Sequence, residues 1–213
     1  MSKRYYIAYG SNLSTEQMAF RTPDAKIVGK AILYGWQLLF KLHATIEENK
    51  EKNTPVLVWE ISQEDEKRLD RYEGYPAYYY KKELPVTVFP IDGGEPMELT
   101  AMVYIMTEGH ERREPMQSYY EVLEQGYREF HFPMHILEHA LRESRKKIRV
   151  TCYGRTEEWD SRAVAMAFYK RAMACSEGNE QGRYTRIYQQ LAVGRSECTD
   201  EEGYDEDSHE KRT

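Results

Sequence analysis

The sequence predicts an α+β protein: a mixed, largely antiparallel or barrel-like sheet with flanking helices. Three observations lead to this expectation. Strand-like segments outnumber helical ones in the first half of the chain. Most connections between them are too short to hold the crossover helices that parallel neighbours need. Beyond Ile148 the pattern changes to amphipathic helical segments, which predicts an appended helical hairpin.

Each expected element has a local signal. Apolar and aromatic runs bounded by glycine or polar residues predict strands, and a serine just before a helical pattern predicts a helix start. Residues 92–96 have the composition of a hairpin turn, and residues 47–53 that of an exposed loop. The expected strands are 5–9, 27–46 (one or two strands), 55–61, 78–89, 97–106 and 148–153, and the expected helices are 14–21, 62–72, 115–130, 133–147, 157–175 and 181–193.

These elements predict three regions along the chain. Residues 1–148 hold the sheet and its helices, and residues 149–198 form the C-terminal helical appendage. Residues 199–213 are rich in Asp and Glu, so we expect an acidic, disordered tail.

Composition limits the classes of function. The 213 residues are 40% hydrophobic and 31% charged, as in a soluble globular protein, and the formal net charge is -6. That charge argues against nucleic-acid binding, which needs a basic surface. No apolar run approaches the length of a membrane span, and the three cysteines are widely spaced and odd in number, which favours reduced thiols. We expect a cytoplasmic protein without a membrane or nucleic-acid partner.

The turn after the first strand is a candidate binding site. An apolar and aromatic strand ends at Tyr9, Gly10, Ser11 and Asn12, and the next residues read as a helix start. A strand that turns directly into a helix leaves several backbone N–H groups free at one place, which suits a carboxylate or a developing oxyanion. Taken alone, the segment is better explained as a tight turn whose polar side chains cap the backbone.

A second candidate is the carboxyl group of Glu73. It stands at the expected C-terminal end of a helix, where the helix dipole disfavours negative charge, and it is surrounded by aromatic residues. Both effects would raise its pKa, and a carboxyl group with a raised pKa can exchange a proton near neutral pH. Taken alone, Glu73 and Gly74 also read as an ordinary helix end.

Together the two segments are more specific than either one. The order Tyr-Gly-Ser-Asn at 9–12, Ala-Thr-Ile at 44–46, Val-Trp-Glu-Ile at 58–61, the stretch 69–79 around Glu73, and then Pro115, Tyr119, Leu123 and Gly126 resembles the gamma-glutamylcyclotransferase family, also called AIG2-like. The resemblance covers residues 4–140 and leaves the C-terminal segments out.

The resemblance implies a small mixed barrel whose cavity is lined by the loop at 9–12. It implies that Glu73 is the acid/base, and that Tyr9, Gly10, Ser11, Asn12, Tyr79 and Tyr119 contact the substrate. The substrate would be a gamma-glutamyl amine or peptide, and the products 5-oxoproline and a free amine or amino acid. Such a transferase or lyase needs neither cofactor nor metal, because the substrate's own α-amine is the nucleophile.

Other functions are compatible with the same sequence. The same cavity could bind a small anionic or nucleotide-like ligand without converting it. The C-terminal hairpin could contribute a wall, a homodimer contact or a surface for a protein partner. The sequence His135-Ile-Leu-Glu138-His139 matches the H-x-x-E-H pattern of some zinc proteases, with His131 one turn earlier, but no acidic ligand helix follows.

Overall fold

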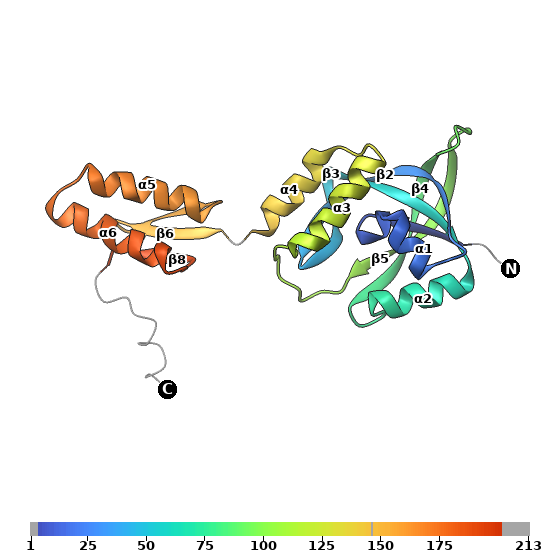
Figure 1. Cartoon of the computed structure of the whole chain (residues 1–213), viewed down its shortest axis with the longest axis horizontal. Coiled ribbons are helices and arrows are strands. Elements are labelled where there is room, and N and C mark those ends of the chain that lie inside the picture. Colours follow the sequence, from blue (N-terminus) through green and yellow to red (C-terminus); the bar gives the residue numbers. More distant parts are fainter. Residues whose placement is uncertain (1–3, 146, 202–213) are drawn as a thin grey trace. The chain divides into compact units, whose positions relative to one another are not determined.

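The computed structural model describes residues 4–145 and 147–201 of the chain. It divides into two compact units, residues 1–144 and 145–213 (Figure 1). The sequence predicts a domain boundary after residue 148, and this domain boundary stays a prediction. The border between the two compact units falls four residues earlier, after Ser144. No helix in the described part of the chain is long and apolar enough to cross a membrane.

The first unit is a closed five-stranded barrel. Its strands follow the order β1-β3-β2-β4-β5, and the parallel pair of β1 and β5 closes the barrel while all other pairs are antiparallel. The predicted fold class is therefore confirmed. The strands are β1 (Arg4–Ala8), β2 (Lys26–Lys41), β3 (His43–Ile61), β4 (Tyr79–Pro90) and β5 (Met97–Met106).

The hairpin of β2 and β3 corrects one prediction. Residues 47–53 are not a loop: they continue β3, and Glu47 pairs with Gln37 while Asn53 pairs with Tyr34. A register shift next to Tyr34 accommodates the extra residues of β3. The polar side chains of residues 47–53 indicate solvent exposure, which a strand can also have. The backbone partner of this segment is β2, and no local sequence pattern reveals that pairing.

Two glycines allow close approaches between elements of this unit. A Cβ at Gly29 would lie 2.2 Å from the carbonyl oxygen of Phe89, so only glycine lets β2 and β4 meet there. A Cβ at Gly126 would lie 2.7 Å from the Cβ of Leu13. Gly126 thus lets a helix pack closely on the turn that follows β1.

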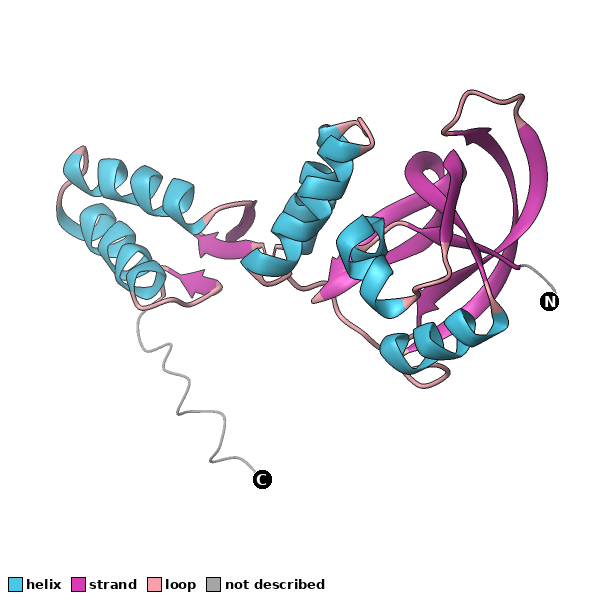
Figure 2. Ribbon diagram, turned by 45° about the vertical axis from the view of Figure 1, so that its right-hand side comes forward, coloured by secondary structure: helices cyan, strands magenta, loops and turns pink. Residues whose placement is uncertain are grey.

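Helices flank the barrel (Figure 2). The Ser14 side chain accepts a hydrogen bond from the backbone N–H of Gln17, and Ser62 with Asp65 forms a capping box. Gly74, with φ 65°, ends the second helix. The helices are α1 (Thr15–Arg21), α2 (Gln63–Glu73), α3 (Gln117–Glu129) and α4 (Met134–Ser144).

The second unit is not a bare helical hairpin, which corrects a second prediction. Its helices α5 (Arg162–Ala174) and α6 (Gly178–Ala192) pack on a three-stranded sheet of order β7-β6-β8. The strands are β6 (Ile148–Cys152), β7 (Arg155–Trp159) and β8 (Glu197–Thr199). The predicted helix from residue 157 was wrong at its start, because Glu157 pairs with Val150 in the sheet.

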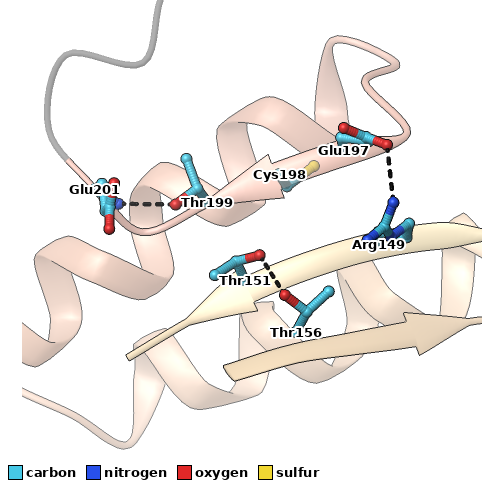
Figure 3. A pocket seen from close by; sticks show the side chains of 7 residues that line it. All are labelled: Arg149, Thr151, Thr156, Glu197, Cys198, Thr199 and Glu201. Carbon is cyan, nitrogen blue, oxygen red and sulfur yellow. Dashed lines mark hydrogen bonds and ion pairs between the residues drawn. The ribbon is translucent and has the colours of Figure 1, made fainter. Parts of the chain in front are cut away.

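One pocket of this unit is lined by polar side chains of the sheet (Figure 3). Arg149 pairs with Glu197 at 3.5 Å, and the hydroxyls of Thr151 and Thr156 lie 2.9 Å apart. The predicted disordered tail begins too early, since Thr199 belongs to β8. Residues 202–213 of that predicted tail lie outside the described residues.

Candidate active site

A small cavity lies where β1 ends, between the following turn and the C-terminal end of α2. It measures about 290 Å³ including its open mouth, and only about 30 Å³ of it can hold the centre of a water molecule. The structure places all seven sequence-predicted site residues on its wall: Tyr9, Gly10, Ser11, Asn12, Glu73, Tyr79 and Tyr119. Segments far apart in the sequence therefore meet at one cavity.

The turn after β1 contributes Gly10, Ser11 and Asn12 to the wall of this cavity. Ser11–Leu13 form a single 3₁₀ turn, whose first bond runs from the N–H of Leu13 to the carbonyl oxygen of Gly10 at 3.0 Å. The N–H groups at the start of a helical turn have no partner within it. Those of Ser11 and Asn12 are the donors that such a turn offers to an anion.

Glu73 faces this turn from the last residue of α2. Its carboxylate Oε1 accepts a hydrogen bond of 2.9 Å from the side-chain amide of Asn12. Burial raises the pKa of Glu73 from 4.5 to about 7, while the Asn12 hydrogen bond and the charge of Arg21 oppose the rise. The sequence predicted a raised pKa, and the structure makes burial its main cause.

Asn12 is held in one orientation by its neighbours. Its amide nitrogen also donates to the Tyr6 hydroxyl at 2.7 Å, and its amide oxygen accepts from Arg21. Arg21 in addition donates to the Ser11 hydroxyl at 3.1 Å. The polar side chains of the turn are thus fixed before any ligand enters.

The tyrosines of the cavity divide into two groups. The hydroxyl of Tyr9 donates to the Tyr104 carbonyl at 2.6 Å, and that of Tyr79 donates to the Ala44 carbonyl at 2.7 Å. Tyr119 instead accepts from the Ala44 backbone N–H at 3.1 Å. A phenol has one hydroxyl proton. Tyr9 and Tyr79 donate theirs in these hydrogen bonds, whereas the hydroxyl proton of Tyr119 has no acceptor among the described residues.

Tyr6 resembles Tyr119 in this respect, because its hydroxyl accepts from Asn12. Burial raises the pKa of both phenols, so each remains a neutral donor near pH 7. Two O–H donors therefore remain available to an acceptor in the cavity, close to Glu73.

Sequence reasoning missed Tyr6, Tyr104 and Arg21. Tyr6 was read only as part of a strand, although its alternation with residue 8 could have placed it on the inner face of the barrel. Arg21 ends α1 and reaches back to the turn at Ser11 and Asn12, with its guanidinium 3.7 Å from the centre of the Tyr72 ring. No local signal distinguishes it from a cation that favours a helix end.

The H-x-x-E-H pattern lies on α4 and not in this cavity. His139 has two cationic neighbours: its Nε2 is 3.5 Å from the Lys52 ammonium and its Nδ1 is 3.1 Å from the Arg142 guanidinium. Positive groups on both ring nitrogens oppose a bound zinc ion. Within residues 4–145 and 147–201 no three His, Cys, Asp or Glu side chains gather closely enough to hold a metal.

Comparison with known proteins agrees with this geometry. The profile of the family described as "Gamma-glutamyl cyclotransferase, AIG2-like" matches residues 6–129, more than half of the chain. The chain belongs to this family. The match runs from β1 to the end of α3, so it includes every residue of the cavity wall and excludes the second unit.

Individual members of the family are similar over the same part of the chain. The gamma-glutamylcyclotransferase of Bos taurus is 30% identical over 141 residues, which are 61% of this chain and 72% of that protein. The Mus musculus protein of the same name is 29% identical over 140 residues, 60% of this chain and 72% of its own. A solved structure named gamma-glutamyl cyclotransferase superposes with a TM-score of 0.56 at 26% identity, covering 65% of this chain and 86% of that one.

Proposed function

We propose that the protein releases 5-oxoproline and a free amine or amino acid from a gamma-glutamyl compound. The observation that carries the proposal is a carboxyl group with a pKa of about 7, held 2.9 Å from Asn12 and facing a turn of hydrogen-bond donors. The names of the similar bovine and mouse proteins support the same chemistry.

Glu73 moves protons in the proposed reaction. As carboxylate it takes a proton from the substrate's α-ammonium group, and the freed amine attacks the side-chain carbonyl carbon to close a five-membered ring. As the bond from that carbon to the leaving nitrogen breaks, Glu73 returns its proton to this nitrogen. The ring nitrogen then loses its second proton through Glu73 to the released amine, which departs as an ammonium ion. Atoms and charges balance without a cofactor, and a pKa near 7 suits both steps.

The donors around Glu73 stabilise the oxygen on which charge develops. The candidates are the backbone N–H groups of Ser11 and Asn12 and the unused protons of Tyr6 and Tyr119. One such donor contributes about 3 kcal/mol to the transition state. Arg21, bonded to the turn, adds positive charge that favours the substrate's carboxylate. A folded glutamyl chain held among these groups loses little further entropy on ring closure.

The test is a Glu73→Gln variant assayed for 5-oxoproline with a panel of gamma-glutamyl amines and peptides. We expect turnover to fall by about a thousandfold, because Gln keeps the shape but cannot accept a proton. Glu64→Gln, an exposed position on the same helix, is the matched control and should retain full activity. In the wild type, kcat/KM should rise with pH through about 7 as Glu73 ionises.

Two outcomes would reject the proposal. Full activity of Glu73→Gln would remove Glu73 from the reaction. Recovery of unmodified ligand from the wild type, with no 5-oxoproline from any substrate of the panel, would favour capture of a ligand in the cavity without turnover.

A further inference from the structure

A second, larger cavity lies between the β2–β3 hairpin and α4. It measures about 830 Å³ including its open mouth, against about 290 Å³ for the cavity of Glu73, and the two cavities share no lining residue. Its floor includes the apolar side chains of Leu38 and Ile136, and its polar wall is formed mainly by groups that donate hydrogen bonds. Nothing in the proposed reaction uses these groups.

Positive groups come to this cavity from two elements. His135, His139 and Arg142 follow one another at helical spacings of four and three, so they share one face of α4. Lys52 reaches the same space from β3. Among the described residues, neither Lys52 nor Arg142 has a carboxylate within 4 Å, whereas Lys81, elsewhere on the barrel, pairs with Glu66 at 2.6 Å.

His139 cannot satisfy both of these cations. A neutral imidazole has one acceptor nitrogen and one N–H, while ammonium and guanidinium groups only donate. Of the contacts from His139 to Lys52 at 3.5 Å and to Arg142 at 3.1 Å, at most one is a hydrogen bond. The other brings two donors face to face, and an acceptor placed between them would relieve the conflict.

Gln37 adds a fourth donor whose direction is fixed. The backbone N–H of Glu51 donates to the Asn49 side-chain oxygen at 3.1 Å, so the Asn49 amide nitrogen must be the group that donates to the Gln37 oxygen at 2.9 Å. The NH₂ group of Gln37 is then left without an acceptor among the described residues. Gln37 is only 9% exposed as a residue, but its NH₂ group still reaches the accessible surface, so it can donate to a ligand in the cavity that Gln37 lines.

We propose that this cavity binds a small phosphorylated molecule. Two cations without a carboxylate partner, the N–H group of an imidazole and a fixed amide match the several acceptor oxygens and the double charge of a phosphate ester. Leu38 and Ile136 would contact the apolar part of the ligand. Glu51 is the one carboxylate in the lining, and it is exposed at the rim, where it can turn to water.

Titration calorimetry with phenyl phosphate and with inorganic phosphate tests this site on the full chain. We expect phenyl phosphate to bind with a Kd of about 1 mM or below, and inorganic phosphate more weakly, because it lacks the apolar group. Lys52→Gln and Arg142→Gln should each weaken binding by about tenfold, since each removes one charge-assisted donor. Both side chains are at the surface or half-buried, so these variants should fold.

Lys67→Gln is the matched control, because Lys67 is an exposed cation of the same unit that lies outside the cavity. Its affinity for phenyl phosphate should equal that of the wild type. The proposal is overturned if neither phosphate binds at about 10 mM, or if Lys67→Gln weakens binding as much as Lys52→Gln, which would indicate unspecific attraction. Glu73→Gln should bind phenyl phosphate unchanged, so this result does not depend on the proposed enzymatic activity.

Discussion

Asp200 in the second unit and Glu73 in the barrel are both carboxyl groups held away from water, yet their pKa values shift in opposite directions. Burial raises the pKa of each. At Asp200 the backbone N–H of Tyr153, 3.0 Å away, and the Arg183 guanidinium, 2.7 Å away, outweigh burial and lower the pKa below its usual value. At Glu73 the single hydrogen bond from Asn12 does not outweigh burial, so the pKa stays above its usual value.

The difference shows how donors around a buried carboxyl group decide its role. Asp200 is 1% exposed and fully engaged, so it ties the end of β8 to the β6–β7 turn and to α6 as a permanent charge. Glu73 has no ion-pair partner within 4 Å among the described residues. Its pKa of about 7 therefore lets the carboxyl group gain and lose a proton near neutral pH. The first arrangement suits stability, and the second suits proton transfer.

The largest expected effect that tests this contrast is a change in the free energy of unfolding of Glu73→Gln. Because the folded state favours protonated Glu73, the wild type loses free energy of unfolding as pH rises from about 4.5 to about 7. At a pH near 8 the variant, which carries no charge there, should be more stable by about 2–3 kcal/mol. This gap should shrink toward zero below about pH 4. Hydrogen exchange in peptides from β1 and α2 measures it.

The sign of this stability difference shows whether the Glu73 carboxylate destabilises or stabilises the folded protein. A variant that is less stable than the wild type at pH 8 would mean that the Glu73 carboxylate is stabilised by its surroundings, contrary to the comparison. The control is Glu64→Gln, whose exposed side chain should leave stability unchanged within about 0.5 kcal/mol at both pH values.

Asp200→Asn should have the opposite sign. Its amide cannot serve as the charged acceptor of Arg183, so we expect the second unit to lose about 2 kcal/mol at pH 7. Because the folded-state pKa of Asp200 is lowered, the loss should be complete above the usual pKa of an aspartate and should diminish as pH falls through the folded-state value. Exchange in peptides of β6 and α6 reports it. An equal loss in acid would contradict a role of the charge.

The barrel could be predicted from sequence because its strands carry local signals. The apolar run at 55–61, the turn at 92–96 and the serine before α2 were each read where the structure has them. Glu73 and the loop at 9–12 could be paired only through their resemblance to a family, because no local pattern tells that β1 and the end of α2 meet. Their roles in catalysis stay predictions.

What the sequence did not reveal depends on distant partners. Residues 47–53 are polar on all sides, and only β2 makes them a strand. In the second unit, β8 is three residues long and joins β6 from the far end of the unit, and Asp200 is in an acidic stretch that reads as disordered. Arg21 looks like any cation at a helix end until Ser11 and Asn12 are seen beside it.

Substitutions of Arg21 give the smallest expected effect, and they test how the charge of Arg21 sets the pKa of Glu73. Its charge lowers the pKa of Glu73, so Arg21→Gln should move the rising limb of kcat/KM to higher pH by a fraction of a unit. Arg21→Lys keeps the charge, and its limb should stay near that of the wild type. Both variants lose the guanidinium on the Tyr72 ring, which contributes about 0.5–1 kcal/mol to stability.

The two substitutions therefore separate charge from packing. If the rising limb moves equally in Arg21→Gln and Arg21→Lys, the hydrogen bonds that orient Asn12 set the pKa of Glu73 and the charge of Arg21 does not. If it moves only in Arg21→Gln, added salt should shift the wild type in the same upward direction, because Arg21 is partly exposed and its field is screened. Glu73 would then be a carboxyl group whose proton affinity is set by burial and trimmed by one nearby cation.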